Sequence, residues 1–269
     1  MTRPNPGDFH DVWLEREGAR LYAAHRGEGR AVICLHGGLA SQLSCRPYAL
    51  PLSERYHVIT PDLRGSDQSV YGGPLSWDQL ADDVAALAAH LGVARAVIAG
   101  SSFGAAVAVR VALRHPQLLD GLVVLHPAFG GAELGFNDAQ RAAFAAMQAV
   151  GERTLTDGIA ALLPLFDALP PEVRERARAA AAAYDPASVA ATTRMIATGG
   201  QPFASPRELA AITAPALVVP GVDPTHPREV ADVFALHLPR CTVRRFPPGD
   251  FMSMLESFRA AIGDFVASL

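Results

Sequence analysis

Short apolar runs alternate along the chain with longer segments in which apolar residues recur at helical spacing. Continuous runs rich in Val, Ile and Leu are typical of strands that are buried on both faces of a parallel sheet. We expect six such strands, within residues 31–38, 57–63, 94–100, 122–126, 216–221 and 242–246. Ahead of them, Val12–Glu15 and Arg20–His25 flank the turn sequence R-E-G-A, which predicts an antiparallel hairpin.

The amphipathic segments between these runs predict helices, and glycine or proline follows two of them as a stop signal, at Gly92 and Pro116. The expected helices are 75–91, 103–114, 227–238 and 251–269, with a weaker helical pattern over 41–54. Strands that alternate with helices indicate the α/β class with a mostly parallel, doubly wound sheet. The hairpin would add antiparallel strands at one edge.

The interval from 128 to 206 has no strand pattern and is rich in alanine, arginine and glutamate, which favour helix. It is too long for a loop inside a compact domain, so we expect a helical insertion. We therefore predict a core domain formed by residues 1–127 and 207–269, and a helical cap formed by residues 128–206. The cap would cover the strand carboxyl ends, where open α/β sheets bind ligands. The alternative is a surface appendage with no role in binding.

Composition narrows the class of protein. The chain has 269 residues, half of them hydrophobic, and a formal net charge of −4 with scattered arginines, which argues against a nucleic-acid partner. Its apolar runs are far shorter than the ~20 residues of a membrane span, and the first residues lack the apolar stretch of a secretory signal. Cys34, Cys45 and Cys241 form no C-x-x-C pattern, so we expect free thiols, no metal and a cytoplasmic protein.

The sequence G-S-S-F-G at 100–104 fits G-x-S-x-G, with Ser102 at its centre between a predicted strand and a predicted helix. A tight turn in that context lifts the serine hydroxyl above the sheet, so Ser102 is a candidate nucleophile. The H-G-G sequence at 36–38 follows the first buried strand. The backbone N–H groups of Gly38 and Phe103 are the candidate oxyanion hole, and His36 is expected to form structural hydrogen bonds.

Strand–H-G-G, strand–D-L-R-G-S-D-Q-S, strand–G-S-S-F-G, a helical insertion and strand–G-V-D-P, in this order, resemble the α/β-hydrolase fold family. The resemblance extends from Val12 to Leu269. It gives Asp62, Arg64, Gly65 and Ser69 the roles of a structural loop. It also implies a catalytic serine, acid and histidine, and Asp223 occupies the position of the acid.

The histidine of that family usually follows the last strand, but this chain has Asp250 there, in F-P-P-G-D-F-M-S-M. A carboxylate, with a reference pKa of about 3.9, accepts a serine proton poorly near neutral pH. One explanation is a relocated base: His226 lies three residues after Asp223, and His126 ends a predicted strand at the same edge. The alternatives to a catalytic role are that His226 faces solvent and that His126 is packed under the cap.

Two further explanations remain. Asp250 could act directly on a substrate in non-hydrolytic chemistry, as in a lyase, isomerase or cyclase, or the chain could be an inactive, ligand-binding member. Our leading hypothesis is a hydrolase of a small or medium ester or lactone, in which Ser102 attacks and His226 is the base. Asp223, and Asp250 beside it, would orient His226. His36, His126 and Phe129 would line the substrate pocket, and no cofactor is expected. The sequence predicts no oligomeric state.

Overall fold

A computed structural model describes residues 9–246 and 251–269 of the chain. Its centre is one eight-stranded sheet in the order β1-β2-β4-β3-β5-β6-β7-β8. The strands are β1 (His10–Arg16), β2 (Ala19–Arg26), β3 (Ala31–Leu35), β4 (His57–Pro61), β5 (Ala96–Ser101), β6 (Leu119–Leu125), β7 (Ala216–Val219) and β8 (Cys241–Val243). The hairpin β1–β2 pairs antiparallel with β4, and every later pair is parallel. The predicted α/β class and edge hairpin are confirmed.

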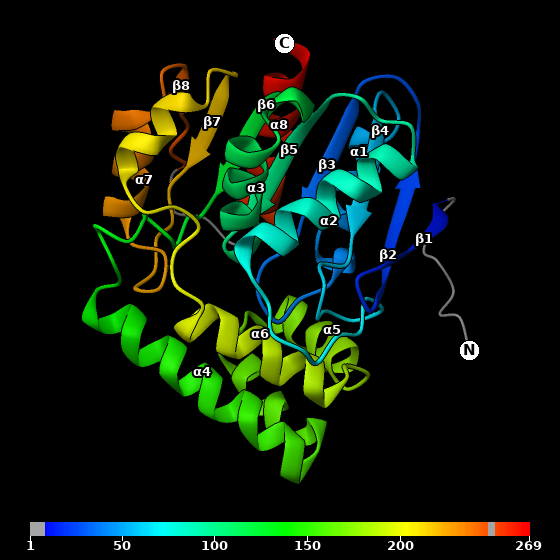
Figure 1. Cartoon of the computed structure of the whole chain (residues 1–269), viewed down its shortest axis with the longest axis vertical. Helices are drawn as coiled ribbons and strands as arrows, with labels where there is room; N and C mark the ends of the chain where they lie inside the picture. The colour runs from blue at the N-terminus through cyan, green and yellow to red at the C-terminus, as the bar shows by residue number, and fades with distance from the viewer. Residues whose placement is uncertain (1–8, 247–250) are drawn as a thin grey trace.

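Helices cover both faces of this sheet (Figure 1). On one face lie α2 (Trp77–His90), α3 (Phe103–Arg114) and α7 (Arg228–His237), and on the other α1 (Arg46–Leu52) and α8 (Phe251–Ala267). Short 3-10 helices occur at Gln42–Ser44, Pro116–Leu118, Ile159–Ala168 and Pro206–Ala211. The weak pattern over 41–54 therefore becomes a 3-10 turn followed by α1.

Alternation along the central strands explains why both faces are covered. In β3, Ile33 and Leu35 belong to the core under α2, α3 and α7, whereas Val32 and Cys34 belong to the core under α1 and α8. Side chains of a strand point alternately to the two faces, so a run that is apolar throughout buries both. The continuous apolar runs of the sequence encode this three-layer arrangement.

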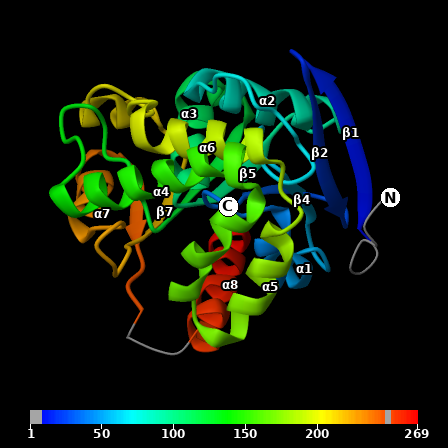
Figure 2. The same ribbon diagram turned by 90° about the horizontal axis from the view of Figure 1, so that it is seen from below.

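The long interval between β6 and β7 is helical, with no strand among its described residues. It contains α4 (Asp138–Asp157), α5 (Pro171–Ala181) and α6 (Pro186–Thr198). Figure 1 shows these helices together beyond one end of the sheet, and Figure 2 shows them in front of it when the molecule is seen from below. We call α4, α5, α6 and the 3-10 helix between α4 and α5 the helical insertion.

The loop after β4 has the structural contacts expected of it. Arg64 is fully buried and forms an ion pair of 2.7 Å with Asp83 of α2, and it also donates to the backbone carbonyls of Arg16 and Glu17. The Asp62 carboxylate accepts from the Gln42 N–H at 2.7 Å. These contacts tie the hairpin, the sheet and α2 together at the edge of the molecule.

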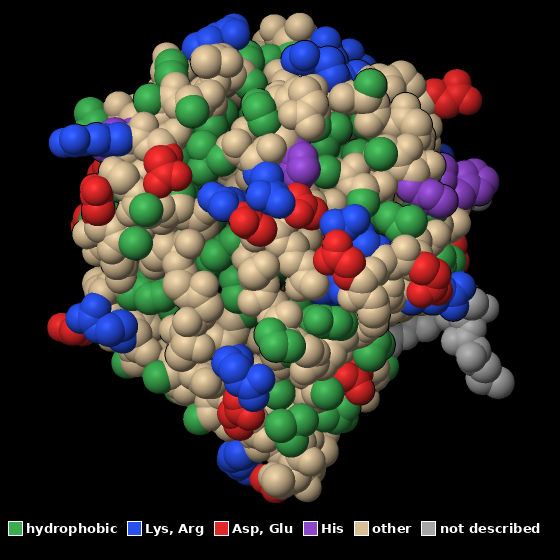
Figure 3. All heavy atoms as spheres, viewed as in Figure 1, with side chains coloured by type: hydrophobic (Ala, Val, Ile, Leu, Met, Phe, Trp, Pro, Cys, Tyr) green, Lys and Arg blue, Asp and Glu red, His purple; other side chains and the backbone are tan. Residues whose placement is uncertain are grey.

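One strand boundary differs from expectation. The last strand was expected at 242–246, but β8 spans only Cys241–Val243. It is an edge strand that pairs on one side with β7, itself four residues long, so a longer strand would have no ladder to join. In the described part of the chain, no helix has the length and apolar character needed to cross a bilayer. Arginine and acidic side chains are interspersed on the face that Figure 3 shows.

Candidate active site

Ser102 occupies a strained turn between β5 and α3. Its backbone has φ 54° and ψ −114°, a left-handed conformation that costs a non-glycine residue about 1–3 kcal/mol. The turn is held on one side, where the Ser102 N–H donates to the Leu125 carbonyl at 2.9 Å. A Cβ at Gly100 would lie 2.1 Å from the Gly104 carbonyl oxygen, so the turn needs glycine there. The predicted strand–turn–helix context of G-S-S-F-G is present.

The imidazole of His226 bridges Ser102 and Asp223. His226 Nε2 lies 2.8 Å from Ser102 Oγ, and Nδ1 lies 2.8 Å from Asp223 Oδ2. An ionised carboxylate can only accept, so Nδ1 carries the proton and Nε2 is left to accept from the serine hydroxyl. The hydrogen bond from His226, and to a lesser extent that from Thr225, holds the pKa of Asp223 well below its usual range, although partial burial acts to raise it. The arrangement can draw a proton from Ser102.

The loop that carries Asp223 and His226 is folded on itself between β7 and α7. The Asp223 carboxylate accepts from the backbone N–H groups of Thr225 at 2.9 Å and His226 at 3.1 Å. A Cβ at Gly221 would lie 2.3 Å from the Cβ of His226, so only glycine fits where the loop leaves β7. Such an Asp-initiated turn places an acid and a histidine three residues apart in contact.

Gly37 and Gly38 pack beside the Ser102 turn. A Cβ built on Gly37 would lie 3.7 Å from that of Ser102, and one on Gly38 would lie 3.7 Å from that of Phe103. The predicted oxyanion donors, Gly38 and Phe103, are therefore neighbours. A Cβ on Gly38 would also meet Ile196 of α6 at 2.6 Å, so glycine allows the helical insertion to approach this point closely.

His36 is fully enclosed, and both of its ring nitrogens are engaged. Nδ1 lies 2.7 Å from the Gly37 carbonyl oxygen, and Nε2 lies 3.0 Å from the Leu63 backbone N–H. The donor and acceptor partners require a neutral ring with its proton on Nδ1, and burial lowers the pKa of His36 to about 4. These contacts are those of the structural hydrogen-bonding residue expected from the sequence.

His126 and Phe129 both lie close to the site. The centroid of the His126 ring is 4.9 Å from that of Phe258 and 6.2 Å from that of His226. Burial, and to a lesser extent the nearby His226, lowers the pKa of His126 to about 4. Phe129 is 2% exposed, with its ring 5.0 Å from that of Trp77. The ring of Phe129 belongs to an aromatic cluster of the core, and the predicted pocket-lining roles of these residues remain predictions.

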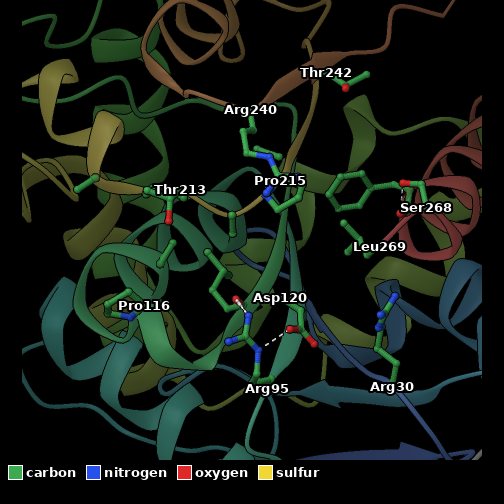
Figure 4. A pocket seen from close by; sticks show the side chains of 17 residues that line it. Arg30, Arg95, Pro116, Asp120, Thr213, Pro215, Arg240, Thr242, Ser268 and Leu269 are labelled. Carbon is green, nitrogen blue, oxygen red and sulfur yellow. Dashed lines mark hydrogen bonds and ion pairs between the residues drawn. The ribbon is translucent and has the colours of Figure 1, made fainter.

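Asp250, the residue at the usual histidine position, lies outside the described residues. A cavity of about 390 Å³ borders Asp223 and His226 and is also lined by Val222, Arg228 and Phe246. Another cavity, of about 610 Å³, lies at the opposite end of the sheet, where the strands begin (Figure 4). Its lining includes Arg30, Arg95, Asp120 and Arg240, and it does not involve the Ser102 turn. No group of three or more His, Cys, Asp or Glu side chains among the described residues could hold a metal ion.

A family model described as the alpha/beta hydrolase fold matches residues 30–191, which is more than half of the chain. The chain belongs to the α/β-hydrolase fold family. The resemblance inferred from the motifs is thus confirmed for the family and the fold. Sequence reasoning did not single out Gly221 and Thr225 of the loop that carries His226, nor Gln140 of α4, whose side-chain amide donates to the Thr225 carbonyl at 3.1 Å. For Gln140 a signal existed, because Asn137 and Gln140 form the N-x-x-Q pattern of a capping box at a helix start.

Other α/β-hydrolase-fold proteins are similar over part or all of the chain. The uncharacterized hydrolase YugF of Bacillus subtilis is 32% identical over 113 residues, which are 40% of this chain and 41% of YugF. Matches to such curated relatives span only about two fifths of their length. A thermophilic esterase from Thermogutta terrifontis superposes with a TM-score of 0.79 at 24% identity, covering 96% of this chain and 98% of the esterase. The enol-lactonase of Burkholderia xenovorans superposes with a TM-score of 0.78 at 19% sequence identity, covering 95% of this chain and 100% of the enol-lactonase.

Proposed function

We propose that the protein hydrolyses a small or medium ester or lactone through a covalent acyl intermediate on Ser102. His226 is the general base, and Asp223 orients it and stabilises its charged form. The single observation that supports this most strongly is the unbroken chain of contacts from Ser102 Oγ through His226 to Asp223, with 2.8 Å at each step. Nucleophile, base and orienting acid within hydrogen-bond reach are the arrangement that serine acyl transfer requires.

The reaction follows from the direction of these hydrogen bonds. Ser102 Oγ forms a bond to the substrate carbonyl carbon while its proton passes to His226 Nε2. When the carbon–oxygen bond to the leaving alkoxide breaks, the same nitrogen returns the proton to it. Water then attacks the acyl-enzyme and gives its proton to His226, and Ser102 recovers a proton as the carboxylic acid leaves. Asp223 remains ionised throughout, which its lowered pKa favours.

The negative charge that develops on the carbonyl oxygen would be held by the backbone N–H groups of Gly38 and Phe103. Three features support this part of the proposal: the proximity of the two residues, the glycine that leaves the backbone uncovered, and the start of α3 at Phe103. A helix N-terminus favours negative charge, and two fixed donors stabilise the oxyanion more than they stabilise the neutral carbonyl. No cofactor is needed for this chemistry.

The substrate class rests on similarity to proteins of the same fold. Proteins of the same fold include an esterase and an enol-lactonase. The cavity of about 390 Å³ borders Asp223 and His226, but neither Ser102 nor the helical insertion lines it, so it is not assigned as the substrate site. We assign residues 128–206 the role of a cap over the candidate active site, because Ile196 of α6 approaches Gly38 so closely.

The test is covalent labelling with a fluorophosphonate, followed by peptide mass analysis and turnover of p-nitrophenyl butyrate. We expect one adduct, on Ser102, and loss of both labelling and turnover in Ser102→Ala. His226→Gln should slow labelling by about 10⁴-fold, as expected for loss of the base in a serine triad. A wild-type protein that is folded but neither labelled nor active on esters contradicts the proposal.

Asp250→Asn separates this proposal from its rivals. With His226 as the base, Asp250→Asn should keep labelling and turnover within about threefold of the wild type, because the substitution leaves the proton path from Ser102 intact. If Asp250→Asn abolishes turnover while Ser102→Ala does not, chemistry by Asp250 on the substrate replaces our assignment. If the folded wild type binds p-nitrophenyl butyrate but does not turn it over, the binding alternative replaces the hydrolase proposal.

A further inference from the structure

A hydrogen bond joins the helical insertion to the loop that carries Asp223 and His226. Gln140, in the first turn of α4, is 1% exposed, and its side-chain Nε2 donates to the Thr225 carbonyl at 3.1 Å and to the Ala128 carbonyl at 2.8 Å. Its Oε1 accepts from the Asn137 backbone N–H at 3.1 Å. Every polar atom of this buried amide is therefore used, which fixes the position of the side chain.

The carbonyl that Gln140 holds belongs to the peptide unit that carries His226. At the other end of that unit, the His226 N–H donates to the Asp223 carboxylate at 3.1 Å. The peptide plane between Thr225 and His226 is thus clamped at its oxygen by Gln140 and at its nitrogen by Asp223. Rotation of a peptide plane moves the Cα and side chain that follow it, so the two clamps together set the direction of the His226 ring.

We propose that Gln140 is a positioning residue for His226, so that the docking of α4 holds the general base in line with Ser102. The inference rests on the proposed function, because it gives His226 the role of base. A shift of about 1 Å at a catalytic group can cost about 10²-fold in rate. Without the two amide donors the loop would sample other peptide orientations, and the distance of 2.8 Å from His226 Nε2 to Ser102 Oγ would lengthen.

Two variants isolate the amide donors. Gln140→Met keeps the length of the side chain and removes all of its hydrogen bonds. Gln140→Glu keeps an acceptor for the Asn137 N–H, as in a common capping box, but offers no donor to the carbonyls of Ala128 and Thr225. A shared effect of the two variants comes from the loss of those donors, and the second variant serves if the first does not fold.

Asn137→Ala is the matched control. Asn137 Oδ1 accepts from the Gln140 backbone N–H at 2.8 Å, so its loss weakens the start of α4, typically by about 1 kcal/mol, while leaving the Gln140 side chain in place. If Gln140 matters only for the stability of α4, Asn137→Ala and the Gln140 variants should behave alike. Thermal unfolding of all three variants shows that each is compared as a folded protein.

The experiment combines hydrogen–deuterium exchange of the peptide that contains residues 223–226 with steady-state kinetics on p-nitrophenyl butyrate. In both Gln140 variants we expect faster exchange in that peptide and a kcat lowered by about ten- to hundredfold, with KM within twofold. Asn137→Ala should show neither change. If the Gln140 variants have the same exchange rate or the same kcat as Asn137→Ala, the inference is wrong, and the hydrolase proposal is unaffected. Absence of Ser102 labelling in the wild type overturns both.

Discussion

Replacement of Asp223 by asparagine tests the direction of the hydrogen bonds that the proposed mechanism needs. The amide oxygen of Asp223→Asn can still accept from the backbone N–H groups of Thr225 and His226, so the loop keeps its turn. The amide nitrogen, however, would face His226 Nδ1 as a donor. The ring would then have to carry its proton on Nε2, the atom that lies 2.8 Å from Ser102 Oγ. A protonated Nε2 cannot accept the serine proton.

The expected magnitude has two parts. The carboxylate contacts Nδ1, but its side chain is 50% exposed, so its attraction to a protonated imidazole, taken at a charge separation of about 4 Å, is about 1 kcal/mol in the water limit and about 4 kcal/mol in the near-surface limit. The tautomer effect is not screened by solvent, and in serine triads it lowers kcat by about 10⁴-fold. We therefore expect Asp223→Asn and Asp223→Ala each to lower kcat by about 10⁴-fold.

The assay is the initial rate of p-nitrophenyl butyrate hydrolysis at saturating substrate near pH 7.5, with fluorophosphonate labelling as a second measure. Asp232→Asn is the control, because it makes the same change on a half-exposed aspartate whose partner is Arg245 at 3.3 Å. We expect that control to retain full activity. If Asp223→Asn keeps more than about a tenth of the wild-type kcat, the carboxylate does not set the tautomer and the proton path is wrong.

Two further predictions concern stability. Asp83→Ala should lower the free energy of unfolding by about 3–5 kcal/mol, because it leaves the buried Arg64 guanidinium without its carboxylate partner. Asp120→Ala breaks the solvent-exposed pair with Arg95 and should lower it by no more than about 1 kcal/mol. Similar denaturation midpoints for the two variants would refute this prediction. Burial lowers the pKa of His36 from 6.5 to about 4, so between these values the unfolded chain binds the proton more readily. His36 should therefore contribute a fall of about 3 kcal/mol in the unfolding free energy as the pH drops through that window, and His126, whose pKa is also lowered to about 4, adds to this fall; a flat profile in urea titrations would contradict neutral, buried rings.

The fold was predictable because its signals are local and repeated. Each buried strand is an apolar run, each covering helix an amphipathic one, and the turn at Ser102 has glycines where a Cβ would clash. Boundaries that depend on pairing were not predictable from the chain alone. The shortness of β8 follows from its edge position and from the length of its only partner, β7.

The residues of the candidate site could be proposed from the sequence, but their arrangement could not. Asp223 and His226 stand three residues apart, which allows both a turn with the ring against the carboxylate and one with the ring in solvent. The contacts that the loop makes with the rest of the fold come from residues far away in sequence. Ser102, which contacts His226, is 124 positions before it, and Gln140, which contacts Thr225, is 85 positions before it. No local pattern reports such contacts. The position of Asp250 lies outside the described residues, so its part stays a prediction.

Under the proposed assignment, acid and base come from a single four-residue stretch, Asp223 to His226, between β7 and α7. In the more common family arrangement they sit on separate turns, and each must be kept in place by its own surroundings. Here one turn carries both, so the proposed proton path from Ser102 to Asp223 uses no residue of the segment that joins β8 to α8. A short graft of this turn would therefore carry both groups into another scaffold of this family, where a donor equivalent to Gln140 would also be needed to hold the Thr225 carbonyl.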